Sequence, residues 1–92
     1  MNIFREFDQL LSDFVDDVVT HKENFNKSDW QKNSNLVTAM KEQFEEFTQV
    51  ITLEEEEYQE YIDLFGQLNN LIIQYINKFN YYILSTLYFQ LN

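Results

Sequence analysis

The chain of 92 residues has no cysteine, no proline and a single glycine, Gly66. Without cysteine it can form neither a disulfide nor a thiolate zinc site, which are common stabilisers of small secreted domains. Proline and glycine are the residues that most often end helices and form turns, so a chain that almost lacks both is typical of a helical protein. These absences favour an all-α fold in a reducing cytoplasm.

Basic residues are also scarce, because six lysines and arginines stand against sixteen acids and the net charge is −10. Nucleic acids and anionic membranes bind surfaces rich in positive charge, so this balance argues against direct binding to either. The N-terminal stretch MNIFREFDQLL contains Glu6 and Asp8 and lacks the basic and apolar regions of a signal peptide. We therefore expect a cytoplasmic protein whose partner is a basic protein.

Motifs that carry catalytic or metal chemistry are not found. The single histidine, His21, cannot supply the two Glu-x-x-His motifs of a di-iron bundle, and one glycine cannot build a phosphate-binding loop. The stretch DFVDDVVTHKEN lacks the alternating oxygen ligands and the glycine of a calcium-binding loop. A narrow bundle with its acids facing solvent also offers no partly dry pocket, so we expect no enzyme, no cofactor, no metal ligand and no catalytic residue.

Hydrophobic spacing predicts a single domain over residues 1–92, a small bundle of about three helices. The first two helices are expected over residues 2–22 and 29–50, the second capped by Ser28 together with Gln31. The predicted apolar face of the first helix consists of Ile3, Phe7, Leu10, Phe14 and Val18, and Phe4, Leu11 and Val15 widen it. The predicted apolar face of the second helix consists of Leu36, Met40, Phe44, Phe47 and Ile51.

A long C-terminal helix is expected over residues 53–89. Apolar residues recur every three or four positions from Tyr58 to Tyr82 without interruption, and Thr52 with Glu55 has the spacing of a capping box. Such a helix is about 55 Å long. A break near Gly66–Asn70, which would give a four-helix bundle, is the alternative. The predicted core consists of Phe7, Phe14, Met40, Phe44, Phe65, Leu68, Ile72 and Phe79.

Charge is divided unevenly along the chain. Residues 1–63 carry a net charge of −11, whereas residues 64–92 contain one charged residue, Lys78. From Leu71 onward the sequence is apolar or aromatic around most of the helix, as in buried helices, but too rich in Asn and Gln for a membrane span. We expect this segment to contact another protein or to form a homodimer through residues 71–91. The alternative is that it is only the central helix of the bundle.

The acids lie opposite the apolar faces, in one row on each predicted helix. A row of acids is also what an ordinary solvated face shows, but few lysines lie between these rows, and typical surfaces mix both signs. Carboxylates three or four residues apart on a helix are about 5–6 Å apart, which is comparable to neighbouring phosphates of a nucleic-acid strand. The predicted partner-binding residues are Asp13, Asp16, Asp17, Glu42, Glu45, Glu46, Glu56, Glu57, Glu60 and Asp63.

The leading functional prediction is therefore an inhibitor or regulator that presents a nucleic-acid-mimicking face to a basic, nucleic-acid-binding protein. Many nucleic-acid-mimicking inhibitors are encoded by phages, so a phage-encoded anti-defence or anti-CRISPR type inhibitor is one example of the predicted role. The alternatives are a secretion chaperone or adaptor, which holds a partner through an apolar helix, and an immunity protein or antitoxin, which neutralises a basic toxin. Binding through the acidic face is expected to be sensitive to salt, and binding through the apolar helix to tolerate it.

Overall fold

The computed structural model describes residues 2–91, which form three α-helices and one short 3-10 helix and contain no strand. In chain order these are α1 (Asn2–His21), η1 (Lys22–Asn24), α2 (Lys27–Val50) and α3 (Glu55–Leu91). The predicted all-α fold with three helices is confirmed. The alternative break near Gly66–Asn70 is wrong, because α3 is continuous through these residues.

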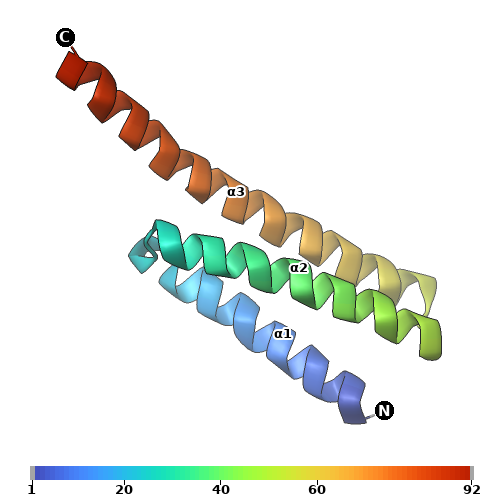
Figure 1. Cartoon of the computed structure of the whole chain (residues 1–92). Helices are drawn as coiled ribbons and strands as arrows, with labels where there is room; N and C mark the ends of the chain where they lie inside the picture. Colours follow the sequence, from blue (N-terminus) through green and yellow to red (C-terminus); the bar gives the residue numbers. More distant parts are fainter. Residues whose placement is uncertain (1, 92) are drawn as a thin grey trace.

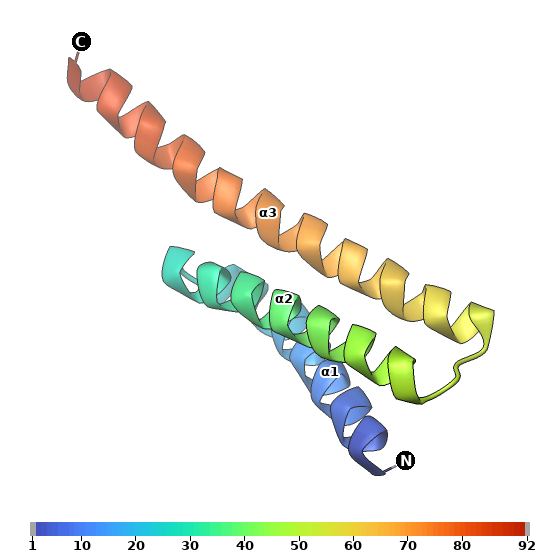
Figure 2. The same cartoon turned by 45° about the vertical axis from the view of Figure 1, so that its right-hand side comes forward.

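Helix α2 lies alongside the N-terminal part of α3, and the C-terminal part of α3 continues beyond the other two helices (Figure 1). Helix α1 also contacts α3, through the Tyr61 ring and hydroxyl. The same arrangement is visible after a rotation of 45° (Figure 2). The molecule is consequently elongated, with dimensions of 59 × 20 × 18 Å.

The N-terminus of α2 is fixed by Asn26, not by the predicted Ser28. The Asn26 Oδ1 atom accepts a hydrogen bond from the Asp29 N–H at 2.8 Å, and the Asp29 Oδ2 atom accepts one from the Asn26 N–H at 3.0 Å. The Phe25 ring, just before the cap, packs edge-on against Trp30 with centroids 5.1 Å apart. A capping box and a hydrophobic staple together begin the helix two residues earlier than Ser28 would.

The N-terminus of α3 also differs from the prediction. The helix begins at Glu55, and the Glu54 carbonyl accepts its first backbone hydrogen bond, from the Tyr58 N–H at 2.9 Å. Thr52 therefore lies in the connection and does not cap the helix. Leu53 packs against the core from this connection. Because Glu55, Glu56 and Glu57 form the first turn, their carboxylates interact favourably with the positive end of the helix dipole.

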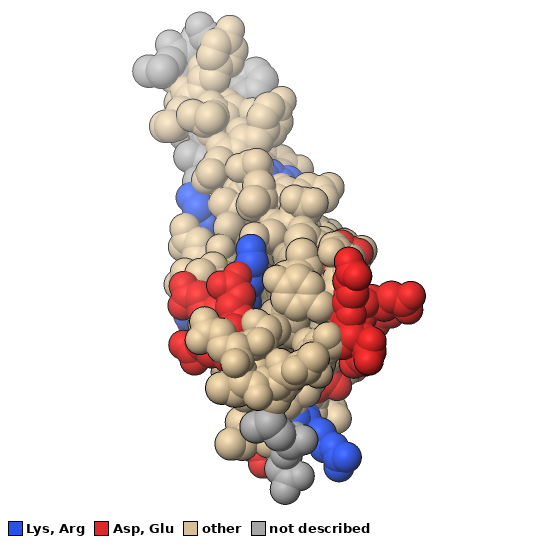
Figure 3. All heavy atoms as spheres, turned by 90° about the vertical axis from the view of Figure 1, so that its right-hand side faces the viewer, with Lys and Arg blue, Asp and Glu red and all other residues tan. Residues whose placement is uncertain are grey.

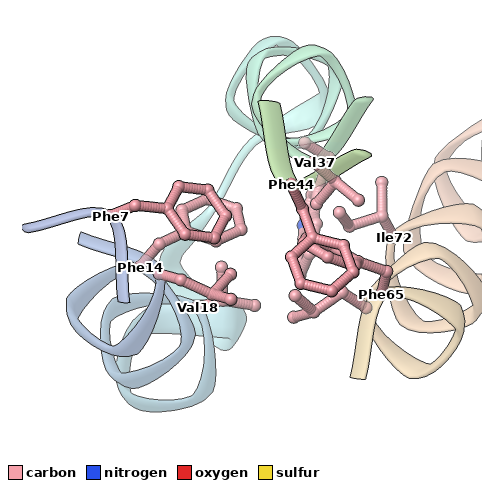
Figure 4. Packing of buried hydrophobic residues seen from close by; sticks show 10 residues of the cluster. Phe7, Phe14, Val18, Val37, Phe44, Phe65 and Ile72 are labelled. Atoms are coloured by element: carbon pink, nitrogen blue, oxygen red, sulfur yellow. The ribbon is translucent and has the colours of Figure 1, made fainter. Parts of the chain in front are cut away.

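One hydrophobic core joins the three helices (Figure 4). It confirms six of the eight predicted core residues, whereas Met40 and Phe79 are only partly buried at its margin. Trp30 and Val37 were not among the predicted core residues and are almost fully buried. Among the side chains that the structure describes, the buried apolar ones are Phe7, Leu11, Phe14, Val18, Trp30, Val37, Phe44, Phe65, Leu68 and Ile72.

Several residues of the predicted apolar faces instead lie at the surface. Ile3 and Leu10 of α1 are each 60% exposed, and Leu36 of α2 is 45% exposed. Consecutive residues are about 100° apart around a helix, so the burial of Val37 turns Leu36 toward the edge of the interface. The same reasoning applies to Leu10 beside the buried Leu11, because each helix buries only one stripe.

Candidate binding surfaces

All ten predicted partner-binding residues are exposed, in keeping with their position opposite the apolar faces of the helices. They are distributed over the three helices as Asp13, Asp16 and Asp17 on α1, Glu42, Glu45 and Glu46 on α2, and Glu56, Glu57, Glu60 and Asp63 on α3. Exposed residues on different helices can bind one partner together only where the packing of the helices brings them close to one another.

Two adjoining hollows between α1 and α3 bring part of the set together. Asp8, Glu57, Glu60, Tyr61 and Leu64 line one of them, and Asp8, Leu11, Ser12, Val15, Asp16, Tyr61 and Leu64 line the other. We call the two hollows together the α1–α3 groove. Its floor is apolar and aromatic, whereas its walls carry four carboxylates. Three of these, Asp16, Glu57 and Glu60, were predicted, and Asp8 was not.

Tyr61 connects the two helices of this groove. Its hydroxyl donates a hydrogen bond to the Asp8 carboxylate, and its ring packs against Phe4 of α1 and Phe44 of α2. Burial raises the pKa of Tyr61 well above its ordinary value of 10.0, and the hydrogen bond and negative charge of Asp8 raise it further. The phenol therefore stays a hydrogen-bond donor, which holds Asp8 on the wall of the groove.

The other predicted carboxylates lie apart from this groove or serve local contacts. Asp13 accepts a hydrogen bond from Gln9 at 2.8 Å, and Asp63 accepts one from Gln59 at 2.9 Å. Both bonds join residues four positions apart on one helix. On α2, helical register places Glu42 and Glu46 opposite the buried Phe44, so they face away from the other helices.

Very little of the negative charge is neutralised within the chain. Among residues 2–91 the only ion pair within 4.0 Å joins His21 Nδ1 to Asp17, at 3.0 Å. Figure 3 shows acids gathered on two flanks of the end of the molecule where α2 connects to α3, with a basic side chain at the inner edge of one flank and mostly uncharged surface between them. In the described part of the chain no three His, Asp or Glu side chains are close enough to hold a metal ion.

At the other end of the bundle, an aromatic contact marks where α3 leaves its neighbours. The Tyr75 ring stacks on Trp30 with centroids 4.5 Å apart, and the Tyr75 hydroxyl donates a hydrogen bond to Glu23 at 3.0 Å. This hydrogen bond, with a smaller effect of burial, raises the pKa of Tyr75. Beyond Phe79, which packs against the core, the helix continues as a projecting segment that we call the arm, residues 80–91.

The arm is apolar and largely uncovered. Of its described side chains, the large exposed ones are Tyr81 (69%), Tyr82 (61%), Leu84 (66%), Leu87 (51%) and Tyr88 (65%). Four residues of the arm, Tyr81, Leu84, Ser85 and Tyr88, line a shallow hollow. The sequence predicted an apolar segment that contacts another protein, but it could not show where the helix leaves the bundle.

No protein-family model, no curated protein and no solved structure matches this chain. Within the described residues, none of the helices combines the length and apolar character needed to cross a membrane.

Proposed function

We propose that the protein acts without catalysis, as an inhibitor or regulator that binds a basic protein through its carboxylates in a cytoplasm. One observation carries the proposal: the ten predicted carboxylates are all exposed, and within residues 2–91 only Asp17 forms an ion pair within 4.0 Å. A surface with this much unneutralised charge attracts basic partners and accelerates their association.

The α1–α3 groove is the part of this surface best suited to a lysine or arginine side chain. Such a side chain has an apolar stem and a charged end. Tyr61 and Leu64 offer apolar surface to the stem, while Asp8, Glu57 and Glu60 offer carboxylates to the charged end. This environment favours the guanidinium group of arginine, because that group can donate hydrogen bonds to two carboxylate oxygens at once.

The rows of carboxylates suit a partner whose natural ligand is DNA or RNA. Helical spacing of three or four residues separates neighbouring carboxylates by about 5–6 Å, so each row resembles a line of phosphates in charge and spacing. A rod about 20 Å wide with these rows could occupy a basic groove that otherwise holds nucleic acid. The expected effect is competitive inhibition of a nucleic-acid-binding protein, with no direct binding of nucleic acid by this chain.

Two triple variants with equal charge changes test this proposal. In one, Glu56, Glu57 and Glu60 of α3 become Gln, and in the other, Glu42, Glu45 and Glu46 of α2 become Gln. The wild type should capture its basic partner from host extract at low salt, release it at high salt, and compete with DNA or RNA for it. If the groove is the contact, the α3 variant should lose the partner and the α2 variant should retain most of it. Undiminished capture by both variants at physiological salt would refute the proposal.

The exposed arm supports a second candidate function. A secretion chaperone, an adaptor, or an antitoxin that uses this helix would cover Tyr81, Leu84 and Tyr88 with an apolar groove or helix of its partner. Contact of this kind depends on apolar burial, so it should persist at high salt. Substitutions in the arm should then weaken binding, while both glutamate triple variants should bind like the wild type.

A further inference from the structure

The outer face of α3, which is turned away from the core, carries a line of exposed apolar side chains near the C-terminal end. Ile73, Tyr81, Leu84 and Tyr88 are 52%, 69%, 66% and 65% exposed. Their intervals of eight, three and four residues keep them on one side of the helix. The preceding residue Ile72 is fully buried, so this side lies well away from the interface with α1 and α2.

The shape of this face suits a second helix packed alongside it. The hollow on the arm is lined by Tyr81, Leu84, Ser85 and Tyr88, that is, by residues i, i+3, i+4 and i+7. These four positions form the hole that receives one side chain of a neighbouring helix in knobs-into-holes packing. Ser85 is small, which leaves room for an incoming ring.

Charge indicates which helix this could be. Residues 1–63 carry a net charge of −11, and Lys78 is the only charged residue that follows. Two copies of the chain therefore repel one another through their bundles, but they can approach through their arms. An antiparallel arrangement also places the two acidic bundles at opposite ends of the pair. Their charges are then separated by more than the Debye length of about 8 Å at physiological ionic strength.

We propose that the outer face of α3 binds the same face of a second copy, with the two helices antiparallel. A two-fold axis between residues 82 and 83 places Tyr81 of each copy opposite Leu84 of the other. Each Tyr81 ring then enters the hollow of the other copy, so the same residue serves as knob on one side and as part of the hole on the other. The contact is isologous, as in most homodimers.

The exposed apolar area is sufficient for a modest dimer. A tyrosine buries about 150–250 Å², so Tyr81 and Tyr88, at about two-thirds exposure, each offer about 100–170 Å². With Leu84 and flanking residues, each copy can bury roughly 400–500 Å², which is somewhat less than half of the 1,200 Å² of the smaller stable interfaces. We therefore expect dissociation constants in the micromolar range.

The arrangement also predicts the shape of the dimer. Each Glu55 lies about 27 residues from the axis, so the two N-termini of α3 are about 80 Å apart. A single copy is 59 Å long. A parallel pair would keep approximately this length and would hold the two acidic bundles side by side.

Sedimentation equilibrium with a matched pair of variants tests the contact. The wild type should dimerise at micromolar concentration, and Leu84→Glu should raise the dissociation constant about 100-fold or more, because it buries a carboxylate without a partner. The control Leu36→Glu changes another exposed leucine, on α2, and should leave the dimer intact. Circular dichroism checks that both variants remain helical, and Leu84→Gln probes the same contact if the glutamate reduces the helical signal.

A mixture of two variants tests the antiparallel register. Leu84→Glu and Tyr81→Lys should each be monomeric alone, but together they should associate, because the introduced carboxylate of one copy then faces the introduced ammonium group of the other. In a parallel pair these two positions do not face each other, so mixing would restore nothing. A wild-type monomer at about 100 µM would overturn the proposal and leave the face to a different protein. A dimer that survives Leu84→Glu would overturn the choice of face, and a mixture that stays monomeric would overturn the register.

Discussion

Phe44 is the side chain on which the packing of the three helices depends most directly. It is fully buried. The centroid of its ring lies 4.8 Å from that of Tyr61, 5.6 Å from that of Tyr58 and 5.8 Å from that of Phe65. On the α1 side its ring stacks against that of Phe7, with centroids 6.5 Å apart. Replacing it with alanine would leave a cavity lined by rings from α1 and α3, and the helix backbones cannot collapse far enough to fill it.

The expected loss is large compared with the stability of the domain. Phe→Ala at a buried site costs about 3–5 kcal/mol, and a domain of this size has a total stability of about 5–14 kcal/mol. Phe44→Ala should therefore lower the melting temperature by at least about 12 °C, since each kcal/mol corresponds to about 4–8 °C in a small domain. Urea titration followed by circular dichroism gives the free energy of unfolding directly.

Phe79→Ala is the matched comparison, because Phe79 is only partly buried at the end of the bundle. It should cost about 1–2 kcal/mol, since the loss scales with the apolar area removed from water. Both variants should be measured in the Leu84→Glu background, where association of arms does not contribute. Equal losses for the two variants, or a loss below about 1 kcal/mol for Phe44→Ala, would refute the central place of Phe44 in the core.

Four further outcomes are expected. Asn26→Ala should cost about 0.5–2 kcal/mol in urea titration, whereas Ser28→Ala should be nearly neutral, because Asn26 makes the capping box. Asn33→Leu should raise the free energy of unfolding by about 1 kcal/mol, because Asn33 is 7% exposed and its buried Nδ2 atom has no hydrogen-bond partner. Gly66→Ala should stabilise by about 0.5–1 kcal/mol, since an added Cβ meets nothing within 4 Å in the middle of α3. The pKa of Tyr61 is higher in the folded protein than in the unfolded chain, so its contribution to stability is fully present below pH 10 and is lost as the pH rises further. Tyr61→Phe should therefore flatten the decline in the free energy of unfolding that is measured above pH 10.

The long helix could be predicted because its signal is periodic and local. Apolar residues recur from Tyr58 to Tyr82, and Gly66 falls on the exposed side, where it interrupts no packing. The glycine therefore costs the helix some stability without breaking it. The composition, almost without turn-forming residues, was equally sufficient for the all-α class.

Helix boundaries and precise faces were less predictable, because they depend on contacts between segments. Ser28 and Asn26 both have side chains suited to capping, and the packing of Phe25 against Trp30 favours Asn26. Val37 is buried and Leu36 is exposed, so the buried face of α2 is rotated by one residue from the predicted one. The direction of that face depends on where α1 and α3 lie. A single sequence carries no direct record of that geometry.

The exposure of the acidic residues followed from their position opposite the apolar faces, but their grouping did not. Asp8 and Glu57 are 49 positions apart in the sequence and line the same hollow only because α1 packs beside α3. The sequence does indicate that Asp8 lies at the edge of the apolar face of α1, because Asp8 follows the buried Phe7. Without the placement of α3, that edge could not be recognised as the wall of a groove.

The salt dependence of partner binding tests the proposed function most directly. The dissociation constant of the captured basic partner should be measured at several salt concentrations for the wild type and for the Glu56/Glu57/Glu60→Gln variant. We expect affinity of the wild type to fall by an order of magnitude or more between low and physiological salt, and the variant to bind more weakly with a shallower dependence. An affinity that is independent of salt and equal in the two proteins would contradict the acidic surface as the site of action.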